Sequence, residues 1–152
     1  MRAGLLQVYR RRLPHWRQVG ATYFVTWRLF RSQPDLAPVE RTVVVDAIRG
    51  FAGVRYDLLA YVVMNDHVHT VVSPAATRTL ASILHSWKSY SAYRLQRVHG
   101  RRGAVWQDES YDRIIRSEAE LRQKLRYVLL NPRRRWSGVK TYPWLWVLGM
   151  ED

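Results

Sequence analysis

Residues 56–73 read YDLLAYVVMNDHVHTVVS. Two runs of aliphatic, aromatic and β-branched residues flank the dipeptide Asn65-Asp66, which favours a tight turn. The segment therefore predicts two strands, over 56–64 and from about His67 to Ser73, that return antiparallel to each other. Both runs are largely apolar, so we expect their side chains to contribute to a core.

Helical and strand patterns surround this hairpin on both sides. The predicted elements are, in chain order, a strand over 19–30, a helix over 38–52, the hairpin, a helix over about 79–98, a strand over 111–115 and a helix over about 118–130. The apolar stripes that define the first two helices are Val39, Val43, Ala47 and Phe51, with Ile48 beside them, and Leu80, Leu84, Trp87, Ser91, Leu95 and Val98. Ser117 caps the third helix, and Asn131-Pro132 is expected to end it. The order predicts an α+β fold, a ferredoxin-like split β-α-β with a central antiparallel sheet of about four strands backed by helices.

Composition limits the classes of protein to which the chain can belong. The 152 residues are 47% hydrophobic and 24% charged, which is typical of one folded domain over 1–152. There are no cysteines, which excludes disulfides, thiolate metal sites and a cysteine nucleophile. The sequence contains no apolar run of about 18 residues and no signal-peptide core, so we expect a cytoplasmic protein that does not span a membrane.

Positive charge is concentrated in two blocks of the chain. The net charge is +13, with 25 basic residues of which 22 are arginine. Residues 1–34 contribute +7 and residues 94–140 contribute +8, whereas the stretch between them is neutral. A basic N-terminal arm over 1–18 contains Arg10, Arg11 and Arg12, and a basic and aromatic extension over 133–152 begins with Arg133, Arg134 and Arg135. Arginine pairs with phosphate oxygens, so a nucleic acid is the expected partner.

His67 and His69 stand at alternate positions of a predicted strand. Side chains at i and i+2 point to the same face, so the two imidazoles would lie side by side with Val68 on the other face. Such a pair can hold one divalent cation through neutral ring nitrogens. Two histidines with ordinary hydrogen bonds are the alternative, but imidazoles on an apolar strand are costly to desolvate without a role.

Tyr127 and Asn131 are four residues apart on the third predicted helix and share one of its faces. An apolar stripe of Leu121, Leu125, Val128 and Leu129 lies beside them and would fix the helix to the sheet. A tyrosine at the edge of the core, followed by a residue that ends the helix, is the alternative interpretation.

These residues together resemble the REP-associated tyrosine transposases, also called Y1 transposases, of the HUH family of single-strand DNA enzymes. Five segments carry the resemblance in the right order: 20–26, 61–69, Trp87-Lys88-Ser89-Tyr90, 105–113 and 126–132. One departure is Asp66, where the family usually has asparagine. The resemblance covers roughly residues 8–146.

The resemblance implies a role for each candidate residue. Tyr127 would be the nucleophile, and His67, His69 and Asn131 would be the metal ligands. Two imidazoles and a carboxamide oxygen suit Mg²⁺ or Mn²⁺. The resemblance also implies single-stranded or hairpin DNA as substrate. Contacts to this DNA are expected from Lys88 and from the two arginine triplets, and bases could stack on Trp136, Trp144 and Trp146.

The implied activity is that of a metal-dependent endonuclease and strand transferase that forms a 5′-phosphotyrosine intermediate. Two alternatives remain open from the sequence. One is a module that binds DNA or RNA hairpins without catalysis, and the other is a metal hydrolase of small phosphoesters with a water nucleophile. The chain could act as a monomer or as a homodimer, with its site completed within one subunit or across two.

Overall fold

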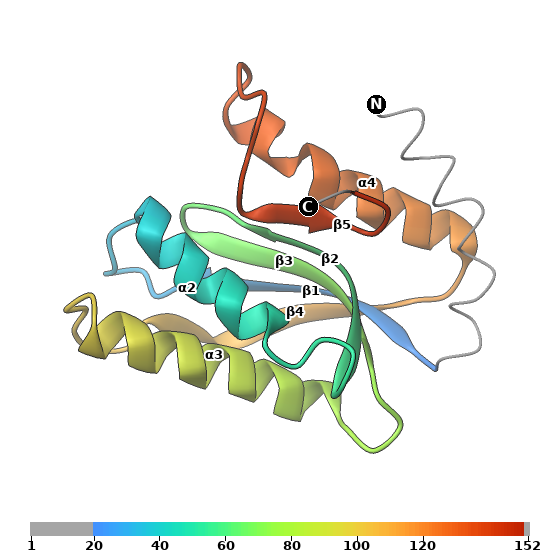
Figure 1. Cartoon of the computed structure of the whole chain (residues 1–152), viewed down its shortest axis with the longest axis horizontal. Coiled ribbons are helices and arrows are strands. Elements are labelled where there is room, and N and C mark those ends of the chain that lie inside the picture. The colour runs from blue at the N-terminus through green and yellow to red at the C-terminus, as the bar shows by residue number, and fades with distance from the viewer. Residues whose placement is uncertain (1–19, 151–152) are drawn as a thin grey trace.

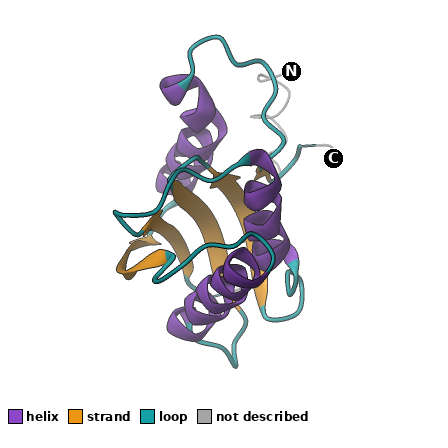
Figure 2. Ribbon diagram, turned by 90° about the vertical axis from the view of Figure 1, so that its left-hand side faces the viewer, coloured by secondary structure: helices purple, strands orange, loops and turns teal. Residues whose placement is uncertain are grey.

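The computed structural model describes residues 20–150, which form one five-stranded antiparallel sheet with helices on both faces (Figures 1 and 2). The elements are β1 (Thr22–Leu29), α2 (Pro38–Arg49), β2 (Tyr56–Val63), β3 (His67–Pro74), α3 (Leu80–Arg97), β4 (Trp106–Ile115), α4 (Glu118–Arg135) and β5 (Leu145–Val147). The strands lie in the spatial order β4-β1-β3-β2-β5. This arrangement confirms the predicted α+β class.

The predicted hairpin occupies the middle of the sheet. Val62 pairs with His69 and Val63 with Val68, and the Met64 amide donates to the His67 carbonyl at 2.8 Å, which closes the turn. β3 also pairs with β1, so its backbone is hydrogen-bonded on both sides. A strand held in this way gives its side chains fixed positions on the two faces of the sheet.

Each face of the sheet carries its own core. α2 and α3 cover one face, where Val68 and Val72 of β3 join a cluster with Trp87 of α3. α4 covers the opposite face, where Val71 of β3 packs with Leu125 of α4. In Figure 1 the sheet lies between α4 above and the α2–α3 pair below. Because side chains alternate along β3, His67 and His69 lie on the α4 face.

The first helix is shorter than predicted and is rotated relative to the predicted stripe. α2 ends at Arg49, and both Val39 and Phe51 are exposed. Glu40 is buried instead, because Arg101 from beyond α3 donates to both of its carboxylate oxygens, at 2.7 and 2.8 Å. Val43, Ala47 and Ile48 are buried as predicted, but a partner as distant in sequence as Arg101 leaves no local pattern, so the apolar stripe does not indicate the burial of Glu40.

The prediction that the third helix ends at Asn131-Pro132 is wrong. α4 continues through Pro132 to Arg135, and the amide of Trp136 donates to the Pro132 carbonyl at 2.8 Å. Asn131 and Pro132 are both buried, so tertiary packing overrides the backbone preference that proline imposes on the residue before it. The three arginines that follow lie in the last turn, where the helix dipole favours positive charge.

Two strands also differ from the prediction. β4 begins at Trp106 rather than at residue 111, and residues 107–110 are all polar, so the apolar signal used to find the strand is absent there. β5 was not predicted, because three residues are too short for a periodic pattern; it adds to the free edge of β2.

Candidate active site

The two histidines of β3 lie next to each other on the α4 face, as the alternation of the strand predicts. Their ring centroids are 4.8 Å apart, and the rings meet edge to face at 74°. His69 is 5% exposed, whereas the side chain of His67 is 16% exposed. The pair therefore spans the boundary between the core under α4 and the solvent.

Hydrogen bonds occupy the same nitrogen of each ring. His67 Nδ1 lies 2.7 Å from Asp66 Oδ1, and His69 Nδ1 lies 2.7 Å from Thr26 Oγ1 on the neighbouring strand β1. The buried Nε2 of His69 has no hydrogen-bond partner among the described residues. A buried polar atom without a partner is costly unless something else binds it, so the free side of His69 is suited to a ligand.

Burial lowers the pKa of His69 most, and together with the electrostatic influence of His67, Arg28, Arg134 and Lys124 it brings the pKa to about 3. The ring is therefore neutral at physiological pH and keeps a lone pair. Arg28 of β1 and Arg134 and Lys124 of α4 thus place basic groups around the histidine pair. An electropositive surround of this kind favours a phosphate group.

Tyr127 projects from α4 toward the histidine pair. Its ring centroid lies 5.2 Å from that of His69 and 5.8 Å from that of Phe24, edge to face in both cases. The neighbouring stripe of α4, with Leu121, Leu125 and Val128, is fully buried and fixes the helix on the sheet. Tyr127 itself is 37% exposed, so a large substrate could reach its phenol.

Asn131 lies one turn after Tyr127 on the same helix and is buried. The spacing of four residues puts it on the same side of α4 as Tyr127. Among residues 20–150 there is no group of three or more His, Cys, Asp and Glu side chains that could hold a metal ion. A cation at the histidine pair would thus need another oxygen donor from the protein, and a carboxamide on α4 is of a suitable chemical type.

Two cations of α4 lie beside the tyrosine. The guanidinium carbon of Arg134 lies 4.5 Å from the centre of the Tyr127 ring, and Arg134 also donates to the Tyr127 carbonyl at 3.2 Å. Lys124 places its ammonium 4.8 Å from the Phe24 ring, which itself stacks on His69 at 5.3 Å. Positive charge near a phenol favours its ionised form.

Of the other arginines predicted to contact DNA, two lie at the end of α4 and three fall outside the described residues. Arg133 and Arg135 are exposed in the last turn of α4, and Arg135 lies over the Trp136 ring at 5.5 Å. Arg10, Arg11 and Arg12 lie outside the described residues.

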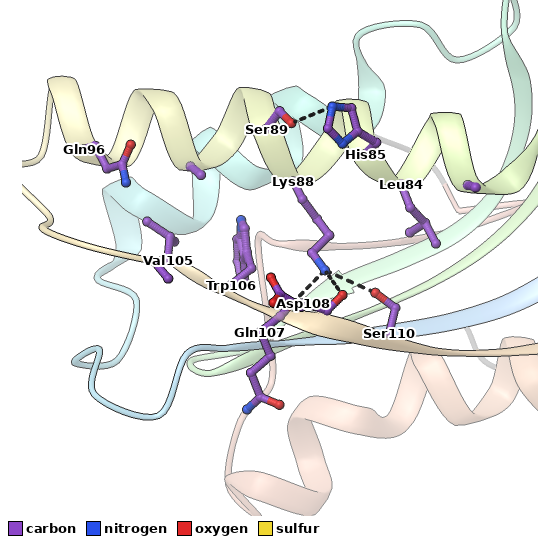
Figure 3. Close-up of a pocket in the computed structure, with 13 residues that line it drawn as sticks. Leu84, His85, Lys88, Ser89, Gln96, Val105, Trp106, Gln107, Asp108 and Ser110 are labelled. Carbon is purple, nitrogen blue, oxygen red and sulfur yellow. Dashed lines mark hydrogen bonds between the residues drawn. The ribbon is translucent and has the colours of Figure 1, made fainter.

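Lys88, which is also predicted to contact DNA, has its ammonium group hydrogen-bonded within the protein. Its ammonium donates to the carbonyls of Gln107 and Asp108, at 2.7 and 3.2 Å, and to Ser110 Oγ at 3.3 Å (Figure 3). It lies in a groove of about 510 Å³ between α3 and β4. Three acceptors satisfy the three N–H groups of Lys88, so this lysine joins α3 to β4.

The tryptophans proposed for base stacking pack against the protein itself. Arg41 of α2 lies over the Trp144 ring at 4.9 Å and over Trp136 at 5.7 Å, and Trp146 stacks on Tyr61 at 6.4 Å. These contacts hold the C-terminal segment against α2 and β2. All three rings are half-buried, so a base would have only part of each surface.

A second basic surface, not found from the sequence, lies on the α2–α3 face. Arg55 and Arg78 line a cavity of about 230 Å³ together with Ser82, Ser86 and the aromatic residues Phe51, Tyr56 and Trp87, and no carboxylate is among the lining residues. The two arginines are isolated in sequence, so no local charge cluster indicates them.

The exposed side of α3 continues this surface with tyrosine–arginine pairs. Tyr90 and Tyr93 are 44% and 57% exposed, and each lies next to the arginine four residues later. Arg94 donates to the Tyr90 hydroxyl at 2.9 Å. Such pairs combine a stacking surface with a phosphate-binding group. The spacing of four residues is visible in the sequence and could have indicated them.

Within residues 20–150, none of the helices combines the length and apolar content that crossing a lipid bilayer would require. The fold is similar to that of a REP-associated tyrosine transposase solved with a REP hairpin, with a TM-score of 0.68 and 22% identity over 83% of this chain and 76% of the other. It is also similar to a protein of Deinococcus radiodurans R1 described as a transposase, with a TM-score of 0.54 and 21% identity over 71% of this chain and 88% of the other.

No curated protein matches the sequence. A family model described as "Transposase IS200 like" matches residues 47–129, more than half of the chain. The matched stretch includes both histidines of β3 and Tyr127. The resemblance to the Y1 transposases is therefore confirmed, and the chain belongs to the IS200-like transposase family.

Proposed function

We propose that this chain is a metal-dependent endonuclease and strand transferase for single-stranded DNA, with Tyr127 as its nucleophile. One observation carries the proposal: the Tyr127 ring lies 5.2 Å from His69, which lies 4.8 Å from His67, all within one chain. Family membership supports transposition as the biological setting. A phenol beside a pair of imidazoles is a suitable arrangement for attack on a phosphodiester.

Tyr127 attacks the scissile phosphorus through its phenol oxygen. The new bond joins this oxygen to phosphorus, the bond from phosphorus to the 3′ oxygen breaks, and the phenol proton passes to solvent while the leaving oxygen takes up a proton. The products are a 5′-phosphotyrosine and a 3′-hydroxyl. A phenol ordinarily titrates near 10, and Arg134 over the ring stabilises the negative charge that develops on it.

His67, His69 and Asn131 would hold a divalent cation, Mg²⁺ or Mn²⁺. The residues fit such an ion, because the buried Nε2 of His69 has no partner among the described residues and the pKa of His69, about 3, keeps the ring neutral. When bound, the ion withdraws charge from the phosphate oxygens and orients the scissile bond. Arg28 and Lys124, which both influence His69 electrostatically, add positive charge around the same phosphate.

A side-chain nucleophile serves strand transfer better than water does. The phosphotyrosine conserves the energy of the broken phosphodiester, so a second 3′-hydroxyl can attack it, release Tyr127 and join two DNA ends. Water would give hydrolysis alone. This chemistry matches a transposase rather than a degradative nuclease.

We propose hairpin DNA as the natural partner. The similar REP-associated transposase was solved with a REP hairpin. In this chain, Arg55 and Arg78 in their carboxylate-free cavity and the exposed Tyr93–Arg97 pair offer a second set of contacts, on the face away from Tyr127. A folded stem bound there and an unpaired strand at Tyr127 would let one molecule hold both parts of a hairpin with a flanking single strand.

The test is a cleavage assay with a labelled single-stranded hairpin and Mn²⁺. The wild-type chain should form a covalent protein–DNA band on a denaturing gel, and Tyr127→Phe should form none. Tyr111→Phe is the matched control, because Tyr111 is an exposed tyrosine on β4. Equal bands from wild type and Tyr127→Phe would reject the nucleophile.

A module that binds hairpins without catalysis remains the alternative, since the basic surfaces would serve it equally well. Chelation distinguishes the two functions. If EDTA abolishes cutting but retains hairpin binding, the enzyme is supported. If no metal produces cutting while binding is tight, the binding module is supported instead.

A further inference from the structure

Hydrogen bonds behind the two histidines determine which ring nitrogen is free. Asp66 Oδ1 lies 2.7 Å from His67 Nδ1, and an ionised carboxylate can only accept a hydrogen bond. His67 Nδ1 must therefore carry a proton. In the neutral ring this leaves a lone pair on Nε2, the nitrogen that faces away from Asp66.

Thr26 makes the corresponding contact to His69, but a hydroxyl can either donate or accept. If Thr26 donated to Nδ1, the proton of the neutral ring would be on Nε2, where the described residues provide no acceptor. A buried N–H without an acceptor costs roughly 1–3 kcal/mol. If Nδ1–H donates to Thr26 instead, Nε2 has a lone pair that a cation can satisfy.

Neighbouring rings keep His69 from rotating out of this arrangement. Phe24 stacks on it at 5.3 Å and 21°, and Tyr127 meets it edge to face at 5.2 Å. Thr26 is itself buried on β1, in register with His69. The Thr26 hydroxyl can therefore accept the hydrogen bond that keeps the proton on Nδ1 of His69.

We propose that Thr26 and Asp66 are positioning residues that hold His69 and His67 in the same tautomer, with the proton on Nδ1 and the lone pair of Nε2 directed to the site beside Tyr127. The link to a bound cation rests on the proposed function, but the tautomers do not. The two supports differ in kind: Thr26 is neutral and buried, whereas Asp66 is charged and 53% exposed. Metal-binding histidines characteristically donate their other N–H to such a partner.

The direct test is ¹⁵N NMR of the histidine side chains in the full chain, without metal or DNA. At a pH at which both rings are neutral, wild type should show protonated Nδ1 and bare Nε2 for both residues. Thr26→Val should shift His69 toward a mixture of tautomers and leave His67 unchanged, and Thr26→Ser should restore the wild-type spectrum. His85, on α3, serves as an internal reference that should not change. An unaltered His69 tautomer in Thr26→Val would overturn its role.

A second test replaces Asp66, whose side chain is largely exposed, so the substitution leaves the core unchanged. Asp66→Ala should release His67 to a mixture of tautomers without affecting His69, whereas Asp66→Asn should retain part of the effect, because its Oδ1 can still accept from Nδ1. A His67 tautomer that stays unchanged in Asp66→Ala would overturn this half of the proposal.

Mn²⁺ titration then connects the tautomers to the cation. Thr26→Val and Asp66→Ala should each weaken Mn²⁺ binding by about 10- to 100-fold, as for other outer partners of metal ligands, and Thr26→Ser should stay within about 3-fold of wild type. Wild-type protein with the expected tautomers but without Mn²⁺ affinity would reject the metal in the proposed function and would leave the positioning roles supported.

Discussion

The two faces of the sheet use their polar groups differently. On the α2–α3 face, the indole of Trp87 donates to the Tyr56 hydroxyl at 3.0 Å, and that of Trp106 donates to Ser91 Oγ at 2.9 Å. On the α4 face, the buried Nε2 of His69 has no partner and Tyr127 is partly open to solvent. Each face keeps a buried nitrogen without a hydrogen-bond partner among the described residues, Trp27 Nε1 on the α2–α3 face and His69 Nε2 on the α4 face. The two differ in their surroundings, because Trp27 packs against the buried Trp87 and Trp106, whereas His69 lies beside the partly exposed Tyr127.

This difference separates stability from chemistry within one small protein. An unsatisfied buried polar group reduces stability by roughly 1–3 kcal/mol, so a fold that retains one must obtain its stability elsewhere. Trp87 and Trp106, which are buried and hydrogen-bonded beneath α2 and α3, are in a position to provide it. Substitutions in the core of the α2–α3 face should therefore change mainly the free energy of unfolding, and substitutions beside Tyr127 should change mainly the cutting of DNA.

The largest expected effect is that of Trp87→Ala. Trp87 is 2% exposed and stacks on Trp27 at 5.6 Å, so its removal should lower the free energy of unfolding by about 3–5 kcal/mol, measured with urea. At low temperature, where the variant is folded, the cutting of a short unpaired strand per folded molecule should stay near wild type. Tyr93→Ala, at an exposed position of the same helix, should change stability by less than about 0.5 kcal/mol. A loss of activity in fully folded Trp87→Ala would contradict the separation of the faces.

The second effect is on the pair that joins α2 to the loop after α3. Replacing Arg101 by methionine leaves Glu40 buried without its partner and should cost about 3 kcal/mol. Arg113→Met, in the exposed pair with Glu120, is the matched control and should have a much smaller effect.

The same variant predicts a pH dependence. The hydrogen bond from Arg101 holds the pKa of Glu40 below its usual 4.5. A lowered carboxyl pKa stabilises the fold fully above about pH 4.5, and this stabilisation is lost as the pH falls through the native pKa. The stability difference between wild type and Arg101→Met should therefore shrink on acidification below pH 4.5. A constant difference would show that Glu40 is not the group involved.

A smaller effect is expected from Arg134→Gln on the α4 face. Loss of the cation over the Tyr127 ring should slow covalent adduct formation about 10-fold, which corresponds to about 1.4 kcal/mol, with little change in stability. Arg135→Gln removes the same charge one residue away, where the side chain contacts Trp136 instead. Equal slowing by both variants would mean that net charge, rather than proximity to the phenol, sets the rate.

The smallest effect concerns DNA binding on the α2–α3 face. Arg55→Ala and Arg78→Ala should each weaken hairpin binding about 3- to 10-fold in fluorescence anisotropy and reduce the slope of log K against log salt by about 1. Cutting of a short unpaired strand should be unaffected. Arg122→Ala, on the surface of α4, serves as the control. Unchanged hairpin affinity would remove this face from the DNA-binding surface.

The sequence predicted the parts of the fold that depend on local periodicity. The hairpin of β2 and β3, the stripe of α3 around Trp87, and the α+β class all follow from spacing and turn residues. The rotation of α2 depends on Glu40 and Arg101, which are 61 residues apart, and the continuation of α4 depends on the burial of Pro132. Neither of these long-range effects leaves a signal in a window of neighbouring residues.

The candidate site shows the same division. His67 and His69 could be placed on one face because a strand alternates, and Tyr127 and Asn131 because a helix repeats in nearly four residues. That α4 would cross directly over the histidines could not be derived from spacing, and it came from the resemblance to a family. No sequence pattern indicates Thr26 as a partner of His69, because its position opposite His69 depends on the pairing of β1 with β3.

On the proposed assignment, the close approach of Tyr127 and His69 within one chain also limits how many DNA ends one molecule can hold. The first cleavage then requires no second protein molecule, so diluting the protein should not lengthen the half-time of cleavage. Each molecule, however, has a single phenol at this position and can store only one severed end at a time. Exchange of two ends must then proceed in succession on one molecule or be shared between two that meet on the same DNA.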